Sequence, residues 1–259
     1  MKQYRFYIYS LFLACCSIPV QAAGLTWLDP SFVERAFYSV ALEREYTKGS
    51  HPLAKWSQPI RIWVDHKVGD QDLHQELAEL HVQHLANITG FSIEFVTNRS
   101  EANVVWVYTR ESRWIKDAKS TLNLKSTQHL RTAICTAGYK TDSSGHIVSA
   151  GIVIPVDLAR SRGKLLACVV EEITQALGLP NDSEHAYPSI FNDHTPEELL
   201  APLDVVLLKL LYEPELQAGM SLSEVKPIVK RLVRKYQIEG KLNSATKEAR
   251  QAPLYELFR

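Results

Sequence analysis

The chain has 259 residues, 46% of them hydrophobic, and a formal net charge of zero. This composition supports a core of ordinary size and excludes a chain that is disordered throughout. The charge balance excludes the strongly basic surface of a typical nucleic-acid-binding protein, so we expect no nucleic acid among its partners.

Residues 1–22 have the pattern of a secretory signal peptide. Lys2 and Arg5 precede an apolar run over residues 6–18, and Val20-Gln21-Ala22 supplies the small residues of a cleavage site. The run is too short for a stable membrane-spanning helix, and no later segment reaches about 20 apolar residues. We therefore expect a periplasmic or secreted protein that has no integral membrane segment after cleavage and keeps 27 basic and 29 acidic residues.

Two cysteines, Cys135 and Cys168, remain after the predicted cleavage, because Cys15 and Cys16 belong to the signal peptide. In an oxidising compartment such a pair most simply forms one disulfide, with two buried thiols as the alternative. The bond would close a loop of 33 residues. For a loop of that size the chain-entropy model gives about 3–4 kcal/mol of stabilisation.

The first elements follow from apolar periodicity. Residues 29–46 predict a helix, and residues 47–59 predict a linker. Whether this helix packs on the rest of the chain stays open. Residues 60–65 alternate as a strand does, and residues 70–90 predict a helix that ends at a glycine. His84 falls in the apolar stripe of that helix, which favours a core histidine over a metal ligand.

The middle of the chain reads as strands. Residues 91–97 and 103–109 are rich in β-branched and aromatic side chains and predict two of them. Residues 110–131 are polar, and we predict no element there. Residues 133–141 and 146–156 flank a turn and predict a β-hairpin.

The last third of the chain predicts helices. One covers residues 164–177. After a long loop, Thr195-Pro196-Glu197-Glu198 has the form of a capping box and predicts the start of an apolar helix. A second capping box, Ser221 to Glu224, opens a helix to about Tyr236, and we expect the last twenty residues to be frayed. The order of elements predicts an α+β fold with helices on one face of a twisted, mixed sheet and a helical C-terminal part.

The helix over residues 165–177 is apolar on most sides and carries one narrow polar stripe. Glu171 and Gln175 are four residues apart and share a face, and Glu172 and Gln175 are three apart and also adjacent. One interpretation is an amphipathic helix whose stripe faces water. The spacing favours a second interpretation.

A zinc peptidase of the HExxH type has two ligands four residues apart and a glutamate, next to the first, that takes a proton from metal-bound water. The metzincin variant adds a glycine turn and then a third ligand. In this chain Glu171 and Gln175 occupy the first two ligand positions, and Glu172 occupies the general-base position. Gly178 occupies the turn, and Asn181 the third ligand position.

The order of elements ahead of this motif is similar to the upper half of a metzincin-type peptidase. The fuller pattern resembles a bacterial secreted family known as domain of unknown function twenty-nine twenty-seven. The matching segments are KWSQPIRIWVD, CVVEEITQALGLPND, SIFND and LDVVLLKLLYEPELQAGM. The resemblance implies a metzincin-like sheet with packed helices but no particular activity. The expected division is a signal peptide (1–22), an N-terminal helix and linker (23–54), a metzincin-like α+β domain (55–220), and a C-terminal helix and tail (221–259).

All three ligand positions of the motif hold oxygen-bearing side chains. Because zinc favours imidazole and thiolate, we expect zinc to be disfavoured and an oxygen-ligated divalent metal to remain possible. Asp182 and His185, in the loop that follows, are possible substitute ligands. Without a strong Lewis acid, Glu172 has no acidified water to deprotonate.

Two interpretations need no metal. A glycan hydrolase would pair Glu172 with Asp182 or Asp193 across a substrate. Alternatively, a hydrogen-bonded network would fasten the loop against the helix. The candidate members of that network are Glu171, Glu172, Gln175, Asn181, Asp182, Ser189 and Asp193.

The sequence therefore predicts an exported, metzincin-like domain that lacks the zinc histidines. Its expected role is that of a non-catalytic binding or structural module of the cell envelope, with an envelope protein, a peptide or a glycan as partner. The alternative is a hydrolase, peptidase-like or glycan-directed, that uses Glu172 as general base with a non-zinc metal or no metal.

Overall fold

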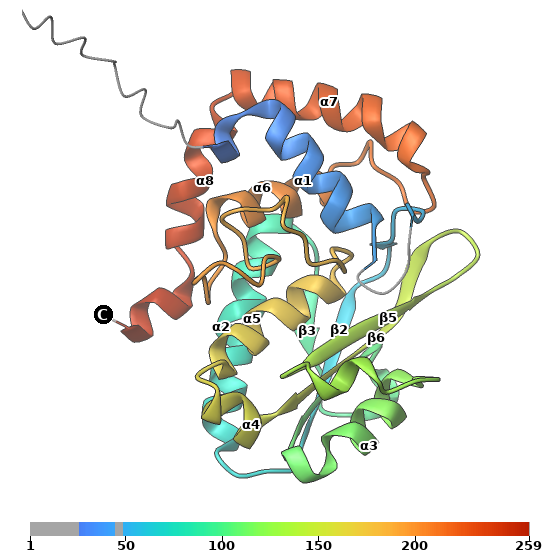
Figure 1. The fold of residues 1–259 in the computed structure, drawn as a ribbon, viewed down its shortest axis with the longest axis vertical. Helices are drawn as coiled ribbons and strands as arrows, with labels where there is room; N and C mark the ends of the chain where they lie inside the picture. Colours follow the sequence, from blue (N-terminus) through green and yellow to red (C-terminus); the bar gives the residue numbers. More distant parts are fainter. Residues whose placement is uncertain (1–25, 45–48, 259) are drawn as a thin grey trace, which may run out of the picture.

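The computed structural model describes residues 26–44 and 49–258 (Figure 1). The predicted signal peptide, residues 1–22, lies outside the described residues. The strands are β1 (Lys55–Trp56), β2 (Ile60–His66), β3 (Ile93–Phe95), β4 (Val104–Thr109), β5 (Thr136–Thr141) and β6 (His146–Pro155). The α-helices are α1 (Pro30–Leu42), α2 (Gln71–Thr89), α3 (Glu111–Leu122), α4 (Val156–Ser161), α5 (Leu165–Ala176), α6 (Pro202–Tyr212), α7 (Leu222–Ile238) and α8 (Lys241–Arg250).

The strands form one mixed sheet, as the α+β prediction requires. Strands β1, β6, β4, β2 and β3 follow one another in that order and pair in parallel, whereas β5 pairs antiparallel with β6. Among the described strands β5 pairs with β6 alone, so it forms an edge of the sheet. The predicted hairpin is confirmed.

Helices cover both faces of this sheet, and the prediction of helices on one face alone is wrong. Trp114 and Ala118 of α3 pack against Val107 and Val153, which point from β4 and β6 toward that helix. The other face carries the main core, to which α1, α2 and α5 to α8 contribute (Figure 1). Helix α3 was missed because only Trp114, Asp117 and Ala118 of its 12 residues are buried, which leaves a stripe too narrow for the periodicity to reveal.

Helix α1 belongs to the main core, which answers the question that the sequence left open. Val33, Phe37 and Val40 are fully buried on its inner face. Asp29 caps the helix by accepting hydrogen bonds from the backbone N–H groups of Ser31 and Phe32. In α2 the predicted end at Gly90 is confirmed.

The predicted helix start at Thr195 is wrong. The hydroxyl of Thr195 donates to the carbonyl oxygens of Ser189 and Asn192 instead of capping a helix. Helix α6 begins at Pro202, and the carboxylate of Asp204 accepts the N–H of Ala201 at 2.7 Å. Local residue types did not distinguish the two starts, because both combine a proline with an acidic residue near the first turn.

The predicted capping box at Ser221 is confirmed, since Glu224 accepts the backbone N–H of Ser221 at 2.8 Å. The expected frayed tail is wrong. Residues 241–250 form α8, and Leu242, Ala245 and Ala249 are buried in the main core. The short 3-10 helix Pro253–Phe258 follows. Within the described residues, no helix is both long and apolar enough to cross a membrane.

Candidate functional site

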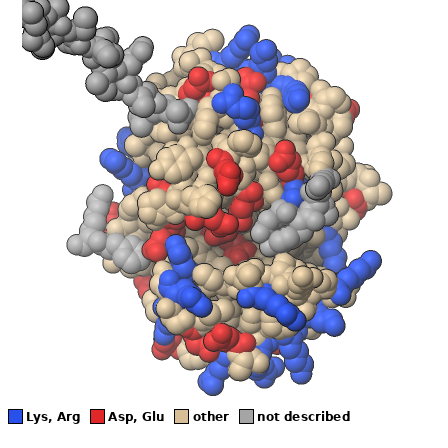
Figure 2. Space-filling view, viewed as in Figure 1, with Lys and Arg blue, Asp and Glu red and all other residues tan. Residues whose placement is uncertain are grey.

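A groove of about 1070 Å³ runs along the edge strand β5, with α5 and the loop over residues 178–201 as its other wall. Leu122 of α3 and Gly138 of β5 line one end, and Glu171, Glu172 and Gln175 of α5 line the other. Figure 2 shows acidic side chains gathered around a hollow near the centre of this face. The motif that the sequence singled out therefore borders this groove.

The disulfide joins the two walls of this groove. Cys135 directly precedes β5, Cys168 lies in the first turns of α5, and their Cα atoms are 5.9 Å apart. The predicted Cys135–Cys168 bond is confirmed. Because it links an edge strand to the helix opposite, it limits how far the groove can widen or close.

The side chains of β5 alternate between its two faces. A Cβ on Gly138 would lie 3.5 Å from Leu122, and one on Gly151, its partner in β6, would lie 2.8 Å from the same side chain. These two glycines therefore let α3 approach the sheet closely. Tyr139 points to the opposite face, toward the main core and α5.

Tyr139 carries a buried polar atom inside the groove. Its hydroxyl has no hydrogen-bond partner among the described residues, although it is inaccessible to water. Burial raises the pKa of Tyr139 to about 12, so the phenol stays protonated near neutral pH. The guanidinium of Arg44 lies 5.8 Å from the ring centre. Tyr139 therefore carries a neutral, unsatisfied hydroxyl in the wall of the groove.

On the α5 wall, Gln175 holds two carboxylates. Its amide nitrogen donates to Asp182 at 2.9 Å and to Glu171 at 3.4 Å. Glu172, next to Glu171, is only 4% exposed and also lines the groove. The first two ligand positions of the motif are thus joined by an amide–carboxylate hydrogen bond.

The third ligand position is directed elsewhere. The side chain of Asn181 donates to the carbonyl oxygen of Ser39 at 3.0 Å, and its backbone N–H donates to that of Val40. Asn181 therefore ties the loop to α1 and does not line the groove. Over residues 26–44 and 49–258, no group of three or more histidine, cysteine, aspartate or glutamate side chains is placed to hold a metal ion.

Gly178 makes the turn that the motif predicts, with φ of 118°. A Cβ there would lie 2.4 Å from the carbonyl oxygen of Ala54, so the position accepts no other residue without a backbone shift. The end of α5 is held further by Trp56, whose indole N–H donates to the carbonyl of Ala176 at 2.9 Å. Packing against β1 thus explains the glycine.

The remaining candidate site residues, His185, Ser189 and Asp193, lie in the loop after the turn but do not come together. His185 is exposed, and Asp193 lies exposed on the rim of the groove. Ser189 is buried and donates to Asp204 at 2.5 Å, away from the α5 stripe. Asp204 also accepts the N–H groups of Ile190 and Ala201, while burial raises its pKa to about 7.

Glu197 was not a predicted site residue, yet it lines the groove. Its Oε2 atom is buried and has no hydrogen-bond donor among the described residues. Sequence reasoning assigned Glu197 to a capping box and gave no role to Tyr139. No local pattern marks either residue, because only the tertiary fold places them along the same groove.

The sequence profile of a family described as protein of unknown function (DUF2927) matches residues 30–231. The match covers most of the chain, from α1 into α7, and includes both walls of the groove. The chain belongs to this family. No curated protein matches the chain.

Proposed function

We propose that this DUF2927 protein is a non-catalytic binding module of the cell envelope that holds an extended polypeptide along β5. The free edge of β5, which borders the groove, is the observation that carries the proposal. An edge strand presents unpaired N–H and C=O groups, and an extended peptide pairs with them as an added strand. The predicted signal peptide and the disulfide support a periplasmic or secreted location.

The composition of the opposite wall favours binding over hydrolysis. The histidine positions of a metzincin hold Glu171, Gln175 and Asn181, and the amide nitrogens of the last two already donate within the protein. A metzincin-like ancestry is part of this proposal: the chain would have kept the cleft between edge strand and helix after losing the metal. Alternate side chains of the bound segment would then contact α5 and supply specificity.

Amide hydrogen exchange tests the proposal, with the other edge strand as an internal control. The disulfide-intact protein is panned against a random heptapeptide library, and exchange is measured with and without the selected peptides. We expect slower exchange in β5 and unchanged exchange in β3, which pairs with β2 alone among the described strands. Protection confined to other elements, or no selected peptide, would contradict strand addition.

A hydrolase remains the second candidate because Glu172 is a buried carboxylate that borders a groove. Elemental analysis of the purified protein, prepared without chelators, measures bound metal. A stoichiometric metal that is lost in Glu171→Ala, together with peptide or glycan cleavage that is lost in Glu172→Gln, would establish the hydrolase and overturn the non-catalytic reading.

A further inference from the structure

Building on the peptide-binding function proposed above, we infer that the groove selects polypeptides with a lysine or arginine side chain, which Glu197 binds. Acidic side chains outnumber basic ones on the α5 side of the groove. The acidic residues that line it all lie on α5 or in the loop after it: Glu171, Glu172, Asp182, Asp193 and Glu197. Of the basic lining residues, Lys140 shares the face of Gly138, toward α3, whereas Lys164 lies at the start of α5 and Arg44 lies 5.8 Å from the ring centre of Tyr139. A bound strand would therefore meet an acidic wall on its α5 side.

Within that wall, Glu197 is the position at which we infer that a cationic group of the ligand binds. The buried carboxylate of Asp204 is well supplied with donors, because it accepts hydrogen bonds from Ser189, Ile190 and Ala201. The Oε2 atom of Glu197 is equally inaccessible but receives none. Such an atom is costly to bury, and a guanidinium or ammonium from a ligand would supply the missing donor.

Tyr139, on β5, sets a second requirement for the ligand, which is an acceptor for its hydroxyl. Its buried hydroxyl is a protonated donor without an acceptor. A ligand that satisfies both atoms carries a cationic side chain and, on its other side, a carbonyl oxygen. An extended polypeptide with a lysine or arginine meets both conditions, whereas a free polyamine offers no carbonyl.

The test compares heptapeptides that differ only at one central residue: lysine, arginine, methionine or glutamate. Methionine matches the length of the lysine stem but has no charge. Binding is measured by calorimetry, and β5 protection by hydrogen exchange. For the wild-type protein we expect lysine and arginine peptides to bind about tenfold or more tightly than the methionine peptide, and the advantage to shrink as salt rises.

Two variants assign the effect to Glu197. Glu197→Gln keeps the shape of the side chain and should remove most of the preference for the cationic peptides. Glu198→Gln, at the adjacent position that does not line the groove, is the matched control and should keep the preference. A double comparison of variant and peptide separates the local contact from a general change of charge.

The outcomes separate this inference from the function on which it rests. If the methionine peptide binds as tightly as the lysine peptide and still protects β5, cation selection is wrong and strand addition stands. An equal loss in Glu197→Gln and Glu198→Gln would overturn the role of Glu197. If no peptide protects β5, the proposed function itself fails. Spermidine serves as a further control, and binding of spermidine as tight as that of the lysine peptide would overturn the need for a polypeptide.

Discussion

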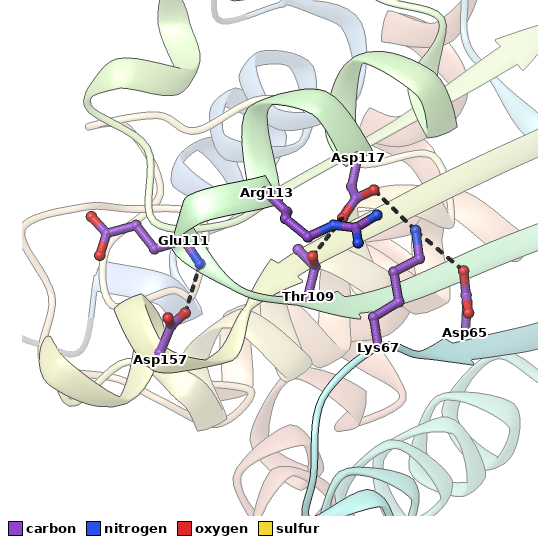
Figure 3. A network of polar contacts seen from close by, with 7 residues as sticks. All are labelled: Asp65, Lys67, Thr109, Glu111, Arg113, Asp117 and Asp157. Atoms are coloured by element: carbon purple, nitrogen blue, oxygen red, sulfur yellow. Dashed lines mark hydrogen bonds and ion pairs between the residues drawn. The ribbon is translucent and has the colours of Figure 1, made fainter.

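Two regions of the protein bury acidic side chains in different ways. At the carboxyl end of β2 and β4, Asp117 of α3 accepts a hydrogen bond from Thr109 at 2.5 Å and one from Lys67 at 3.0 Å (Figure 3). Lys67 also lies 3.4 Å from Asp65. In the groove, Glu197 has a buried oxygen with no donor among the described residues. The carboxylate of the first region has its donors within the protein, whereas the second keeps an oxygen without a donor, which is the observation behind the proposed ligand.

The difference separates a carboxylate that fastens two elements together from one that marks the proposed binding site. A carboxylate with partners of its own, such as Asp117, has its pKa held below the usual range by Thr109, Lys67 and Arg113 despite its burial. Its contacts fasten α3 to the sheet. Unsatisfied polar atoms that border a cavity carry no such structural benefit, and their cost is offset when a ligand binds.

The largest expected effect on stability comes from removing the disulfide that joins the walls of the groove. Replacing Cys135 and Cys168 by serine should lower the free energy of unfolding by about 3–4 kcal/mol, because the unfolded chain regains the entropy of a 33-residue loop. Urea denaturation measures the change. An unchanged midpoint would show that packing alone holds α5 against β5.

The next largest effect on stability concerns the hydrogen bonds of Asp117 with Lys67 and Thr109. Asp117→Ala leaves Lys67 and Thr109 without their acceptor and should cost about 3 kcal/mol. Arg113→Ala is the control, because Arg113 is 57% exposed at its side chain and 3.7 Å away, and it should cost under about 1 kcal/mol. Equal losses in the two variants would contradict the assignment of the network to buried contacts.

A third prediction concerns histidines of α2, which are buried without charge. Desolvation lowers the pKa of His74 to about 4 and that of His81 to about 3. Between pH 6.5 and 4 the unfolded chain therefore binds protons that the folded protein does not, so stability falls as pH falls.

His74→Phe tests this pH dependence. Phenylalanine keeps the stack on Tyr108, whose ring centre is 4.7 Å from that of His74, and removes two buried nitrogens without partners. Denaturation at a series of pH values should show a shallower loss for the variant, with a difference on the order of 1–2 kcal/mol at pH 4. Parallel curves would rule out His74 as a source of the acid sensitivity.

The smallest expected effects on stability come from removing the hydroxyl group of either of two tyrosines. Tyr139→Phe removes an unsatisfied hydroxyl and should raise the stability of the unliganded protein by up to about 1 kcal/mol. Tyr108→Phe removes a hydroxyl that donates to the carbonyl of His74 at 3.2 Å and should lower it by about 1 kcal/mol. Thermal denaturation distinguishes the two signs. A loss in both variants would show that Tyr139 has a partner within the protein.

Much of the fold follows from local patterns. The strands β2, β4 and β6 and the helices α2 and α5 show periodicities that survive without knowledge of their neighbours. The end of α2 at Gly90 and the capping box at Ser221 are interactions between residues close in sequence. The disulfide was predictable because the mature chain offers a single pair.

The candidate site was predictable only in part. The spacing of Glu171, Gln175 and Gly178 drew attention to α5, and α5 does border the groove. The same spacing placed Asn181 in the third ligand position, but the side chain of Asn181 donates to Ser39 of α1, which is about 140 residues away along the chain. A motif fixes which residues share a helix face and does not fix where a following loop directs its side chains.

The sequence by itself determined the prediction of an export signal, the strands β2, β4 and β6, the helices α2 and α5, and the single cysteine pair, because each depends on residues that are near one another or on simple counting. Only the tertiary structure decided the helices α3 and α8, whose buried stripes are narrow or built from alanines, and the true start of α6 at Pro202. It also decided the groove. Tyr139 and Glu197 are far apart in sequence, and a cavity exists only where packed elements fail to meet, which no local pattern encodes.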